Sequence, residues 1–262
     1  MIPRAAITEW ANHIPFKDMH NVEQDIIINR ALIAIYSNNF LSQRLAFRGG
    51  TAIHKLYFSP SKRFSEDIDL VQINFEPIGP TLDKLKEVLS FMGTAKTKLK
   101  MNNNVLLFQF ETTFPPISVR KLKIEINCKE HFSVLDRVTV PFGMNNQWFS
   151  GNCQINTYTF EELIGSKIRA LYQRKKGRDL FDLNYAIESG KLDIRQTIQC
   201  YRHYISFPNH DVPSVKEYAL NLKLKMKDPV FCNDIAPIIS PEIDYDITLA
   251  YEKVMDTIVM AM

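Results

Sequence analysis

The chain has 262 residues, of which 45% are hydrophobic and 23% are charged, and its formal net charge is +3. This composition predicts an ordinary globular protein of one large or two modest domains, with enough apolar residues for a packed core. No apolar run approaches the roughly 20 residues of a membrane-spanning helix, and the first residues lack a signal-peptide pattern, so we expect a cytoplasmic protein without a membrane partner.

The cysteines and histidines exclude several kinds of site. The cysteines lie far apart and form no C-x-x-C pair, which argues against a zinc knuckle or a disulfide framework and favours buried, reduced thiols. They are Cys128, Cys153, Cys200 and Cys232. The histidines form no H-E-x-x-H motif, and a polar helix position is a sufficient explanation for His54.

The first chemically informative segment follows a predicted core helix over residues 21–36. Gly49 and Gly50 permit a tight turn, and Thr51 is expected to cap the helix that begins there. A turn that leads into a helix N-terminus presents free N–H groups and the positive end of the helix dipole. This turn therefore suits a phosphate group.

A pair of aspartates follows on a predicted strand. Asp67 and Asp69 are two residues apart, so their carboxylates point to the same face of the strand. Two like charges repel each other unless a cation lies between them, and ligation by oxygen alone favours Mg²⁺ or Mn²⁺ over zinc. A phosphate-binding turn beside a divalent-metal site indicates a site for a nucleoside triphosphate.

The acid-x-acid spacing alone has little specificity, because the chain holds 29 acidic residues. We interpret its other occurrences as solvated turns or helix faces. They are Glu23/Asp25, Glu242/Asp244 and Asp244/Asp246. The pair at Asp67 and Asp69 differs because its neighbours are typical of a strand and a Gly-Gly-Thr turn precedes it.

The next part of the chain predicts a helix and then three strands. Residues 82–92 form an amphipathic pattern, and the segments 97–101 and 105–111 are separated by three asparagines that favour a hairpin turn. Residues 118–130 predict a further strand, with Leu122, Ile124 and Ile126 on one face and Lys121, Lys123, Glu125 and Asn127 on the other.

Glu125 has two interpretations. It is a third carboxylate for a site that holds two divalent ions, which need more oxygen ligands than two aspartates supply. Alternatively, it forms an ion pair with Lys121 or Lys123 on a solvated strand face.

Residues 130–160 are poorly periodic and contain Pro141, Gly143, Asn145, Asn146 and Gly151, so we expect them to link two regions. The following residues predict helices, the first over residues 160–176, with Lys167 beside an apolar stripe and Gly177 as its stop signal. A second helix begins near Asp179, and Asp182 lies one turn further on.

The basic residues at the end of the first of these helices have an ordinary explanation. Arg174, Lys175 and Lys176 complement the helix dipole at its C-terminus, which is worth about 0.3 to 1 kcal/mol each, or they make a diffuse nucleic-acid contact. The remaining segments, residues 214–226 and 246–262, also predict helices. We therefore expect a domain over residues 1–155 and a helical C-terminal domain over residues 156–262.

Four segments carry a family resemblance. GGTAIHKLY and RFSEDIDLV resemble the signature of the nucleotidyltransferase superfamily, and most closely that of the AbiEii and MenT group of toxins from bacterial toxin–antitoxin systems. KLKIEIN resembles the strand that supplies the third acid, and GSKIRALYQRKKGRDLFDL resembles the later motifs. The long spacer between the glycine turn and Asp-x-Asp fits the toxin branch.

The resemblance implies an α+β fold: a nucleotidyltransferase-like mixed β-sheet domain flanked by helices, and a mainly α-helical C-terminal domain. It implies that Mg²⁺ or Mn²⁺ is held by Asp67, Asp69 and Glu125. It further implies that the nucleotide is held by Gly49, Gly50, Thr51 and Lys167. An aspartate is expected to position Lys167, and the choice between Asp179 and Asp182 stays open.

The implied activity is transfer of a nucleoside monophosphate from a nucleoside triphosphate to an acceptor hydroxyl, with release of pyrophosphate. The resemblance suggests an RNA acceptor such as the 3′ end of tRNA, and a cognate antitoxin as partner. Three alternatives stay open: a protein acceptor, transfer of a phosphate instead of a nucleotide, and a nucleotide-binding partner protein without turnover. The sequence does not select the nucleotide or the acceptor.

Overall fold

The structure is a computed structural model that describes residues 2–99 and 102–262. The chain divides into two compact units. The N-terminal unit comprises Met1–Phe132, Arg137–Tyr158 and Ser240–Glu242, and the C-terminal unit comprises Ser133–Asp136, Thr159–Ile239 and Ile243–Met262. Each unit is described by itself below.

The N-terminal unit is a seven-stranded sheet with helices packed on it. Its helical elements are α1 (Arg4–Ala11), α2 (Met19–Tyr36), α3 (Asn39–Ser42), α4 (Gly49–Ala52), which continues into the π-helix η1 (Ile53–Tyr57), α5 (Gly79–Val88) and the 3₁₀ turn η2 (Ser90–Met92). Its strands are β1 (Leu45–Arg48), β2 (Ile68–Gln72), β3 (Lys96–Lys98), β4 (Asn103–Glu111), β5 (Val119–Asn127), β6 (Val138–Asn146) and β7 (Phe149–Thr157).

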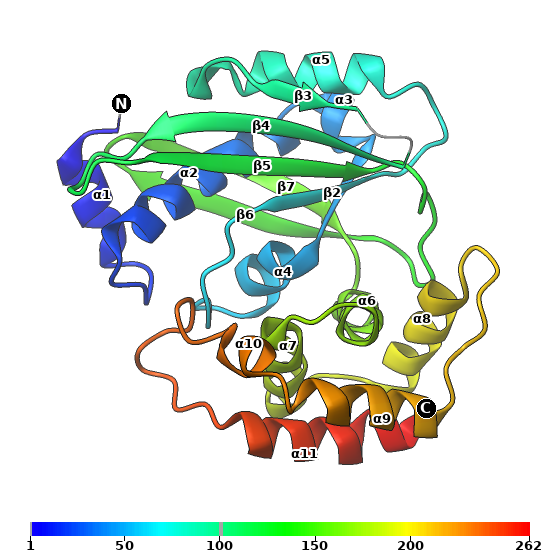
Figure 1. Cartoon of the computed structure of the whole chain (residues 1–262). Coiled ribbons are helices and arrows are strands. Elements are labelled where there is room, and N and C mark those ends of the chain that lie inside the picture. The colour runs from blue at the N-terminus through cyan, green and yellow to red at the C-terminus, as the bar shows by residue number, and fades with distance from the viewer. Residues whose placement is uncertain (1, 100–101) are drawn as a thin grey trace. The chain divides into compact units, whose positions relative to one another are not determined.

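The strand order is β3-β4-β5-β2-β1-β7-β6. The pairs β2–β5 and β1–β7 are parallel and the other pairs are antiparallel, so the predicted mixed sheet is confirmed. Figure 1 shows α5 above the strands and α4 below them. The expected hairpin of residues 97–111 is present as β3 and β4, while Lys100 and Met101 of its first segment lie outside the described residues.

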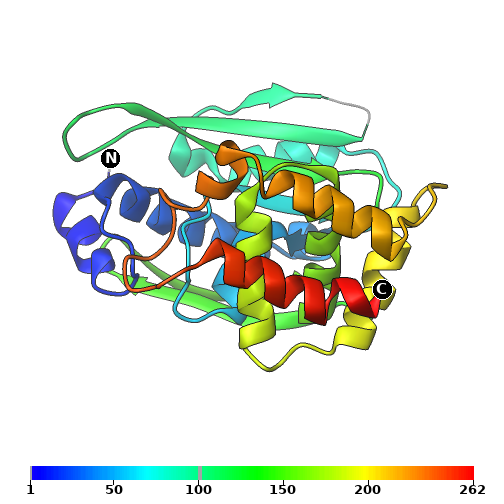
Figure 2. The same cartoon turned by 60° about the horizontal axis from the view of Figure 1, so that its bottom comes forward.

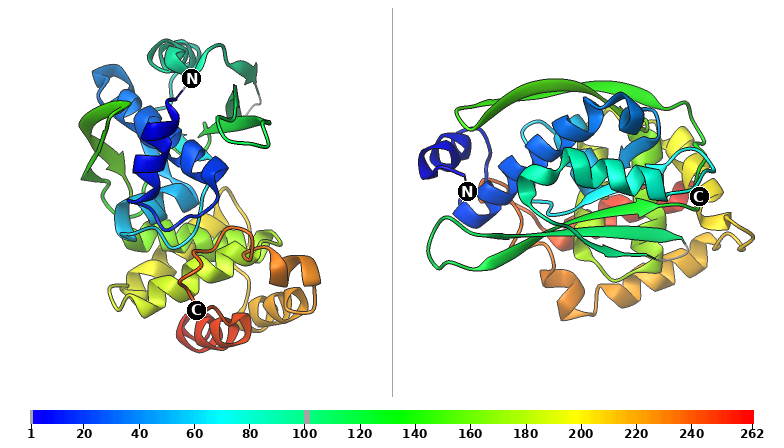
Figure 3. Two further views of the ribbon diagram at one scale, coloured as in Figure 1. Left: turned by 90° about the vertical axis from the view of Figure 1, so that its left-hand side faces the viewer. Right: turned by 90° about the horizontal axis from the view of Figure 1, so that it is seen from above.

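The helix α2 confirms the predicted core helix and corrects one interpretation. It packs against β6, β7 and α5, and Figure 3 shows α2 and α5 side by side in the view from above. Glu23 and Asp25 are buried, so this acidic pair does not lie on a solvated helix face. Glu23 accepts hydrogen bonds from the backbone N–H and the hydroxyl of Thr113, and Asp25 forms an ion pair with Lys55, with Asp25 Oδ1 and Lys55 Nζ 2.6 Å apart.

Residues 130–160 do not form the expected linker, because most of them belong to the hairpin β6–β7. Pro141 is compatible with this hairpin because β6 is an edge strand of the sheet, where proline is tolerated. Both strands are largely half-buried with alternating exposure, so their apolar pattern is weak. The glycines, the proline and the asparagines therefore misled the prediction.

An arginine fastens this hairpin to α2. The guanidinium carbon of Arg30 lies 4.1 Å from the ring centroid of Phe91, 4.5 Å from that of Trp148 and 5.0 Å from that of Phe149. Trp148 occupies the turn between β6 and β7 and Phe149 begins β7. The arginine thus joins α2, η2 and the hairpin through its cation–π contacts.

We expect Arg30→Met to lower the free energy of unfolding by about 1 kcal/mol, because methionine keeps much of the packing but loses the cation–π attraction. Urea denaturation measures the difference. The control is Lys98→Met, which removes a positive charge from the exposed strand β3 and should leave stability nearly unchanged. Equal stability of Arg30→Met and the wild type would show that the charge contributes nothing.

The C-terminal unit is helical. It contains α6 (Phe160–Gln173), α7 (Gly177–Glu188), α8 (Ile194–Ser206), α9 (Val215–Lys225), α10 (Pro229–Asn233), α11 (Ile247–Thr257) and the 3₁₀ turn η3 (Val259–Ala261). The helix α6 packs against α7, α8 and α9, and α7 packs against α11, which crosses it in Figure 2. The predicted α+β architecture is therefore confirmed.

The close packing of α6 against α8 depends on a glycine. A Cβ atom on Gly165 would lie 2.7 Å from Cys200 Cβ and 2.9 Å from the carbonyl oxygen of Thr197. Such short distances exclude larger residues unless the helices separate. The buried carboxylate of Glu162 adds polar contacts, because it accepts hydrogen bonds from the backbone N–H groups of Val134 and Leu135 and from the Tyr204 hydroxyl.

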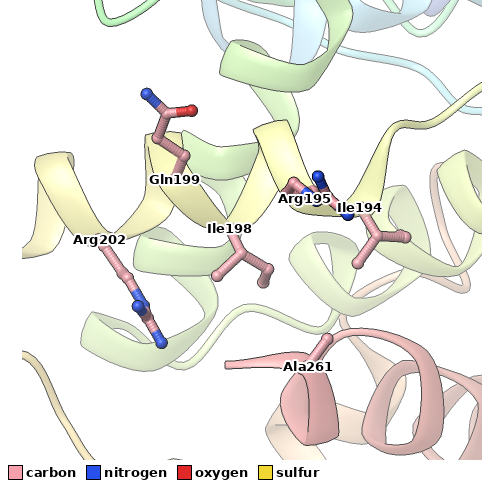
Figure 4. A pocket seen from close by; sticks show the side chains of 6 residues that line it. All are labelled: Ile194, Arg195, Ile198, Gln199, Arg202 and Ala261. Atoms are coloured by element: carbon pink, nitrogen blue, oxygen red, sulfur yellow. The ribbon is translucent and has the colours of Figure 1, made fainter.

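A cavity of about 630 Å³ lies along α8 in the C-terminal unit. It is lined by Ile194, Arg195, Ile198, Gln199, Arg202 and Ala261. In Figure 4, Ile194, Ile198 and Arg202 point to the side of α8 where Ala261 lies, whereas Gln199 points away. The lining holds no carboxylate, so this cavity offers no acidic ligand for a metal ion.

Candidate active site

The three acids predicted as metal ligands come together on neighbouring strands. Asp67 immediately precedes β2, Asp69 lies on β2, and Glu125 is the Cα partner of Asp69 on β5. Because partners in register point to the same face of a sheet, and residues two apart share a face, all three carboxylates lie on one face. The side chains of Asp67 and Glu125 are 32% and 31% exposed, so their oxygens are accessible to a ligand.

A lysine ammonium lies between two of these carboxylates. Lys123 Nζ is 2.9 Å from Asp67 Oδ2 and 3.3 Å from Glu125 Oε2. Burial raises the pKa of Asp67, and the hydrogen bond and charge of Lys123 oppose that rise. Burial favours a lower pKa for Lys123, but the hydrogen bond to Asp67 and the charges of Asp67, Glu125 and Asp69 raise it above its ordinary value, so the ammonium stays charged.

The ion pair between Glu125 and a lysine of β5, one of the two interpretations of Glu125, is thus present with Lys123. This ion pair is compatible with Glu125 as a third metal ligand, because the bound ammonium shows that these acids accept a cation between them. Sequence reasoning named Lys123 only as a possible partner of Glu125. It missed the contact with Asp67, which depends on the register of β5 against β2.

The glycine turn packs directly against Asp69. Gly49 has a φ of 81°, a left-handed conformation that favours glycine, and a Cβ atom at this position would overlap with Asp69 Oδ2. Gly49 is thus needed both for its backbone conformation and for its closeness to the carboxylate. The predicted association of the glycine turn with the aspartate strand is a direct contact.

Thr51 has a different role from the expected helix cap. The helix α4 begins at Gly49 with Arg48 at its N-cap position, and no side chain caps it. The buried Thr51 hydroxyl instead lies 2.5 Å from the carbonyl oxygen of Asp67 and 2.8 Å from Ser65 Oγ. Thr51 therefore fastens the glycine turn to the segment that carries Asp67.

An ion pair that the sequence gave no signal for lies beside Asp69. Arg48 Nη1 is 2.6 Å from Glu130 Oε2, and Arg48 is the register partner of Asp69 on β1. Burial opposes the charge of Arg48, but the charge and the hydrogen bond of Glu130, with smaller effects of Tyr158 and Asp69, raise the pKa of Arg48. Residues 48 and 130 are far apart in the sequence, which explains why no local pattern indicated the pair.

The donor set suits a hard divalent ion in its chemistry, because all its ligand atoms are carboxylate oxygens on one face. Lys123 shows that a cation is accepted between Asp67 and Glu125. Within residues 2–99 and 102–262, no group of three or more His, Cys, Asp and Glu side chains is arranged closely enough to hold a metal ion as the structure stands.

His54 is buried in η1 and accepts a hydrogen bond from the backbone N–H of Lys62.

The C-terminal unit contains a second charged cluster, around Lys167. Lys167 Nζ lies 2.9 Å from Asp179 Oδ1 and 3.0 Å from Asp182 Oδ2, and the side chains of both aspartates are 0% exposed. Arg174 forms a bidentate pair with Asp179, with nitrogen–oxygen distances of 2.7 and 2.8 Å. Both aspartates contact the lysine, so the geometry is consistent with either Asp179 or Asp182 as the residue that positions Lys167.

Arg174, Lys175 and Lys176 do not lie in the last turn of α6, because that helix ends at Gln173. The prediction that they complement its dipole is therefore wrong. Each pairs with an acid: Arg174 with Asp179, Lys175 with Asp228 and Lys176 with Asp234. Gly177 begins α7 instead of ending α6.

The pairing with Arg174 predicts a change in pH dependence. Burial raises the pKa of Asp179, but the charges of Lys167 and Arg174 outweigh it and hold the pKa below its ordinary value of 3.8. A carboxyl whose pKa is lowered by folding stabilises the fold above its unfolded pKa, and this contribution is lost as the pH falls through the folded pKa. Arg174→Gln removes one of the charges that lower the folded pKa of Asp179, so the loss should begin at a higher pH than in the wild type.

Urea denaturation of the wild type and Arg174→Gln across the acidic range measures this shift. Lys191→Gln, at an exposed position of the same unit, is the control. The explanation fails if Arg174→Gln and the control lose stability at the same pH.

Two solved structures share the fold. MenT4, a nucleotidyltransferase toxin from Mycobacterium tuberculosis, is 13% identical with a TM-score of 0.60, over 97% of this chain and 98% of that chain. A candidate nucleotidyltransferase from H. pylori is 15% identical with a TM-score of 0.54, over 94% of this chain and 95% of that chain. The fold is thus that of a nucleotidyltransferase-like toxin.

The family follows from the sequence. Residues 30–255 match the family described as "Nucleotidyl transferase AbiEii toxin, Type IV TA system", so the chain belongs to this family of nucleotidyltransferase enzymes. The predicted resemblance is confirmed. A comparison with curated protein sequences found no match. In the described part of the chain, no helix has the length and apolar character needed to cross a membrane.

Proposed function

We propose that this protein transfers a nucleoside monophosphate from a nucleoside triphosphate to an acceptor hydroxyl. The observation that supports this most is the placement of Asp69, which is in register with Glu125 on one side and in contact with Gly49 on the other. The acids are suited to bind a cation and the adjacent glycine turn is suited to bind a phosphate, so both could be bound next to each other. The family membership supports the same class of reaction.

In the proposed reaction, the acceptor oxygen forms a bond to the α-phosphorus and the bond from that phosphorus to the bridging oxygen of pyrophosphate breaks. The turn at Gly49, Gly50 and Thr51 is proposed to hold the phosphates through its backbone N–H groups. Glu125 is proposed to accept the proton of the acceptor hydroxyl, since its side chain is partly exposed. Pyrophosphate leaves with the electron pair of the broken bond.

Asp67, Asp69 and Glu125 are also the residues proposed to hold Mg²⁺ or Mn²⁺. When bound, such an ion supplies charge neutralisation at the phosphates and lowers the pKa of a hydroxyl that it contacts. The carboxylates, which lie on or directly before two paired strands, would hold the ion at a fixed position. In the C-terminal unit, Lys167 is proposed to bind the triphosphate, with Asp179 and Asp182 holding its ammonium.

The proposed acceptor is RNA, and the proposed site on it is the 3′ end of tRNA. The support is the family, whose members are toxins of type IV toxin–antitoxin systems, and the fold shared with a toxin. Modification of tRNA would block translation, which gives a toxin its effect. A cognate antitoxin is accordingly the proposed partner, in the cytoplasm.

The acceptor is tested by incubating the protein with total RNA or total protein extract and each of the four nucleoside triphosphates, labelled on the α-phosphate. We expect label in RNA, with one nucleotide preferred, in Mg²⁺ and not in excess EDTA. Label found only in the protein extract would show that the acceptor is a protein and not RNA. No label in either extract would favour a nucleotide-binding partner protein without turnover.

A further inference from the structure

Lys123 places a permanent cation where the proposed function requires a metal ion. Its ammonium contacts Asp67 and Glu125 at once, at 2.9 and 3.3 Å. These two carboxylates belong to different strands, so the lysine connects β5 to the segment before β2. Both contacts are made to carboxylates that the proposed function assigns to a divalent ion.

The strand register explains this position. Ile68 pairs with Ile124 and Asp69 pairs with Glu125 in the parallel ladder, so continuing the ladder by one residue sets Asp67 beside Lys123. Lys123 and Glu125 are two residues apart and share a face of β5. A lysine at this position therefore lies beside two acids whenever the sheet is formed.

We propose that Lys123 is a resident cation that holds Asp67 and Glu125 in place before metal binds, and that a divalent ion must displace it. This inference rests on the proposed function, because it takes these acids as the metal ligands. The ammonium lies between Asp67 and Glu125, where an ion bound to both would lie, and two cations held there repel each other strongly in a partly buried site. Lys123 thus lowers the affinity of the site for metal ions. When no metal ion is bound, its charge offsets the repulsion between the carboxylates.

The variant Lys123→Met tests the first consequence. Methionine has a similar length and no charge, and its thioether is a poor ligand for hard ions. Electron paramagnetic resonance of free Mn²⁺, without nucleotide, measures the dissociation constant. We expect Lys123→Met to bind Mn²⁺ roughly three- to tenfold more tightly than the wild type.

Lys121→Met is the matched control. Lys121 lies on the same strand, shares a face with Lys123 and Glu125, and is exposed. Its removal changes the net charge equally, so it should leave the Mn²⁺ affinity near that of the wild type. Equal or weaker Mn²⁺ binding by Lys123→Met, compared with Lys121→Met, overturns the inference.

The variant Asp69→Asn distinguishes failure of the inference about Lys123 from failure of the proposed function. If the wild type binds Mn²⁺ and Asp69→Asn does not, the metal site stands, and the affinity of Lys123→Met decides the inference alone. If neither the wild type nor Lys123→Met binds Mn²⁺, the proposed metal site and the inference both fail.

Thermal unfolding tests the second consequence without turnover. In EDTA, Lys123→Met should melt roughly 2 °C or more below Lys121→Met, because its carboxylates have lost their counter-charge. Saturating Mn²⁺ should close this gap. Equal melting temperatures in EDTA would show that Lys123 does not stabilise the empty site, which contradicts its role as a resident cation.

Discussion

Replacing Asp69 with asparagine is expected to lower the rate of nucleotide transfer by roughly 10²- to 10³-fold or more, because the charge that holds the metal is lost. Asp69 is central in the site, since it is in register with Glu125 and in contact with Gly49. Asparagine has the same shape as aspartate and so preserves the packing against the glycine turn. The measurement is the initial rate of α-phosphate label transfer to RNA.

Asp83→Asn is the control for this experiment. Asp83 lies on α5 in the same unit, its side chain is 79% exposed, and its ion pair with Lys86 joins neighbouring turns of one helix. Its removal should leave both transfer and stability almost unchanged. Thermal unfolding confirms that Asp69→Asn is folded, and a folded Asp69→Asn with wild-type rate would remove Asp69 from the catalytic site.

Replacing Lys167 with methionine is expected to destabilise the C-terminal unit by about 3 to 5 kcal/mol, because it leaves two buried carboxylates without their shared counter-charge. Both Asp179 and Asp182 are fully buried, and Asp179 also forms an ion pair with Arg174. Urea denaturation measures the loss. The double variant Lys167→Met with Asp182→Asn should recover part of it, since one of the two buried carboxylates is then replaced by a neutral amide.

Lys253→Met serves as the comparison, since its ion pair with Glu188 is half-exposed and belongs to the same unit. The proposed role of Lys167 in triphosphate binding is tested separately, by nucleotide titration under conditions where Lys167→Met is folded. Weaker nucleotide binding by the folded variant supports that role. If Lys167→Met is as stable as Lys253→Met, the buried cluster does not contribute to stability as the geometry requires.

The sequence predicted the parts of the site that depend on local pattern. Strand alternation places Asp67 and Asp69 on one face of their strand and Glu125 on the polar face of its own, and helical periodicity predicts the helices that carry Lys167 and Asp179. Such periodicities are local, so a single segment is enough to reveal them. The mixed sheet and the helical unit followed from the family resemblance.

What the sequence missed depends on contacts between distant segments. Thr51 could serve as a helix cap in isolation, and only the folded chain brings its hydroxyl to the carbonyl of Asp67. Asp25 looked solvated because its partner Lys55 lies 30 residues away. In the same way, the second acid beside Lys123 comes from the register of two strands that are not adjacent in the chain.

The hairpin β6–β7 and the end of α6 were mispredicted for a different reason. Glycine, proline and asparagine are typical of loops, but an edge hairpin tolerates them because one of its sides needs no partner. The sequence predicts Gly177 as the stop signal of a helix over residues 160–176, whereas α6 ends at Gln173 and the three cations after it pair with acids of α7 and of the segment around α10.

The most direct test of the central claim compares two labels on the preferred nucleoside triphosphate. RNA is incubated with the wild type and Mg²⁺, using label on either the α- or the γ-phosphate, with Asp69→Asn and Asp83→Asn in parallel. Nucleotide transfer predicts that α-label enters RNA with the wild type and Asp83→Asn, that γ-label does not, and that Asp69→Asn transfers neither. Entry of γ-label, with a stoichiometry of one phosphate and no α-label, would show a phosphotransferase and contradict the account.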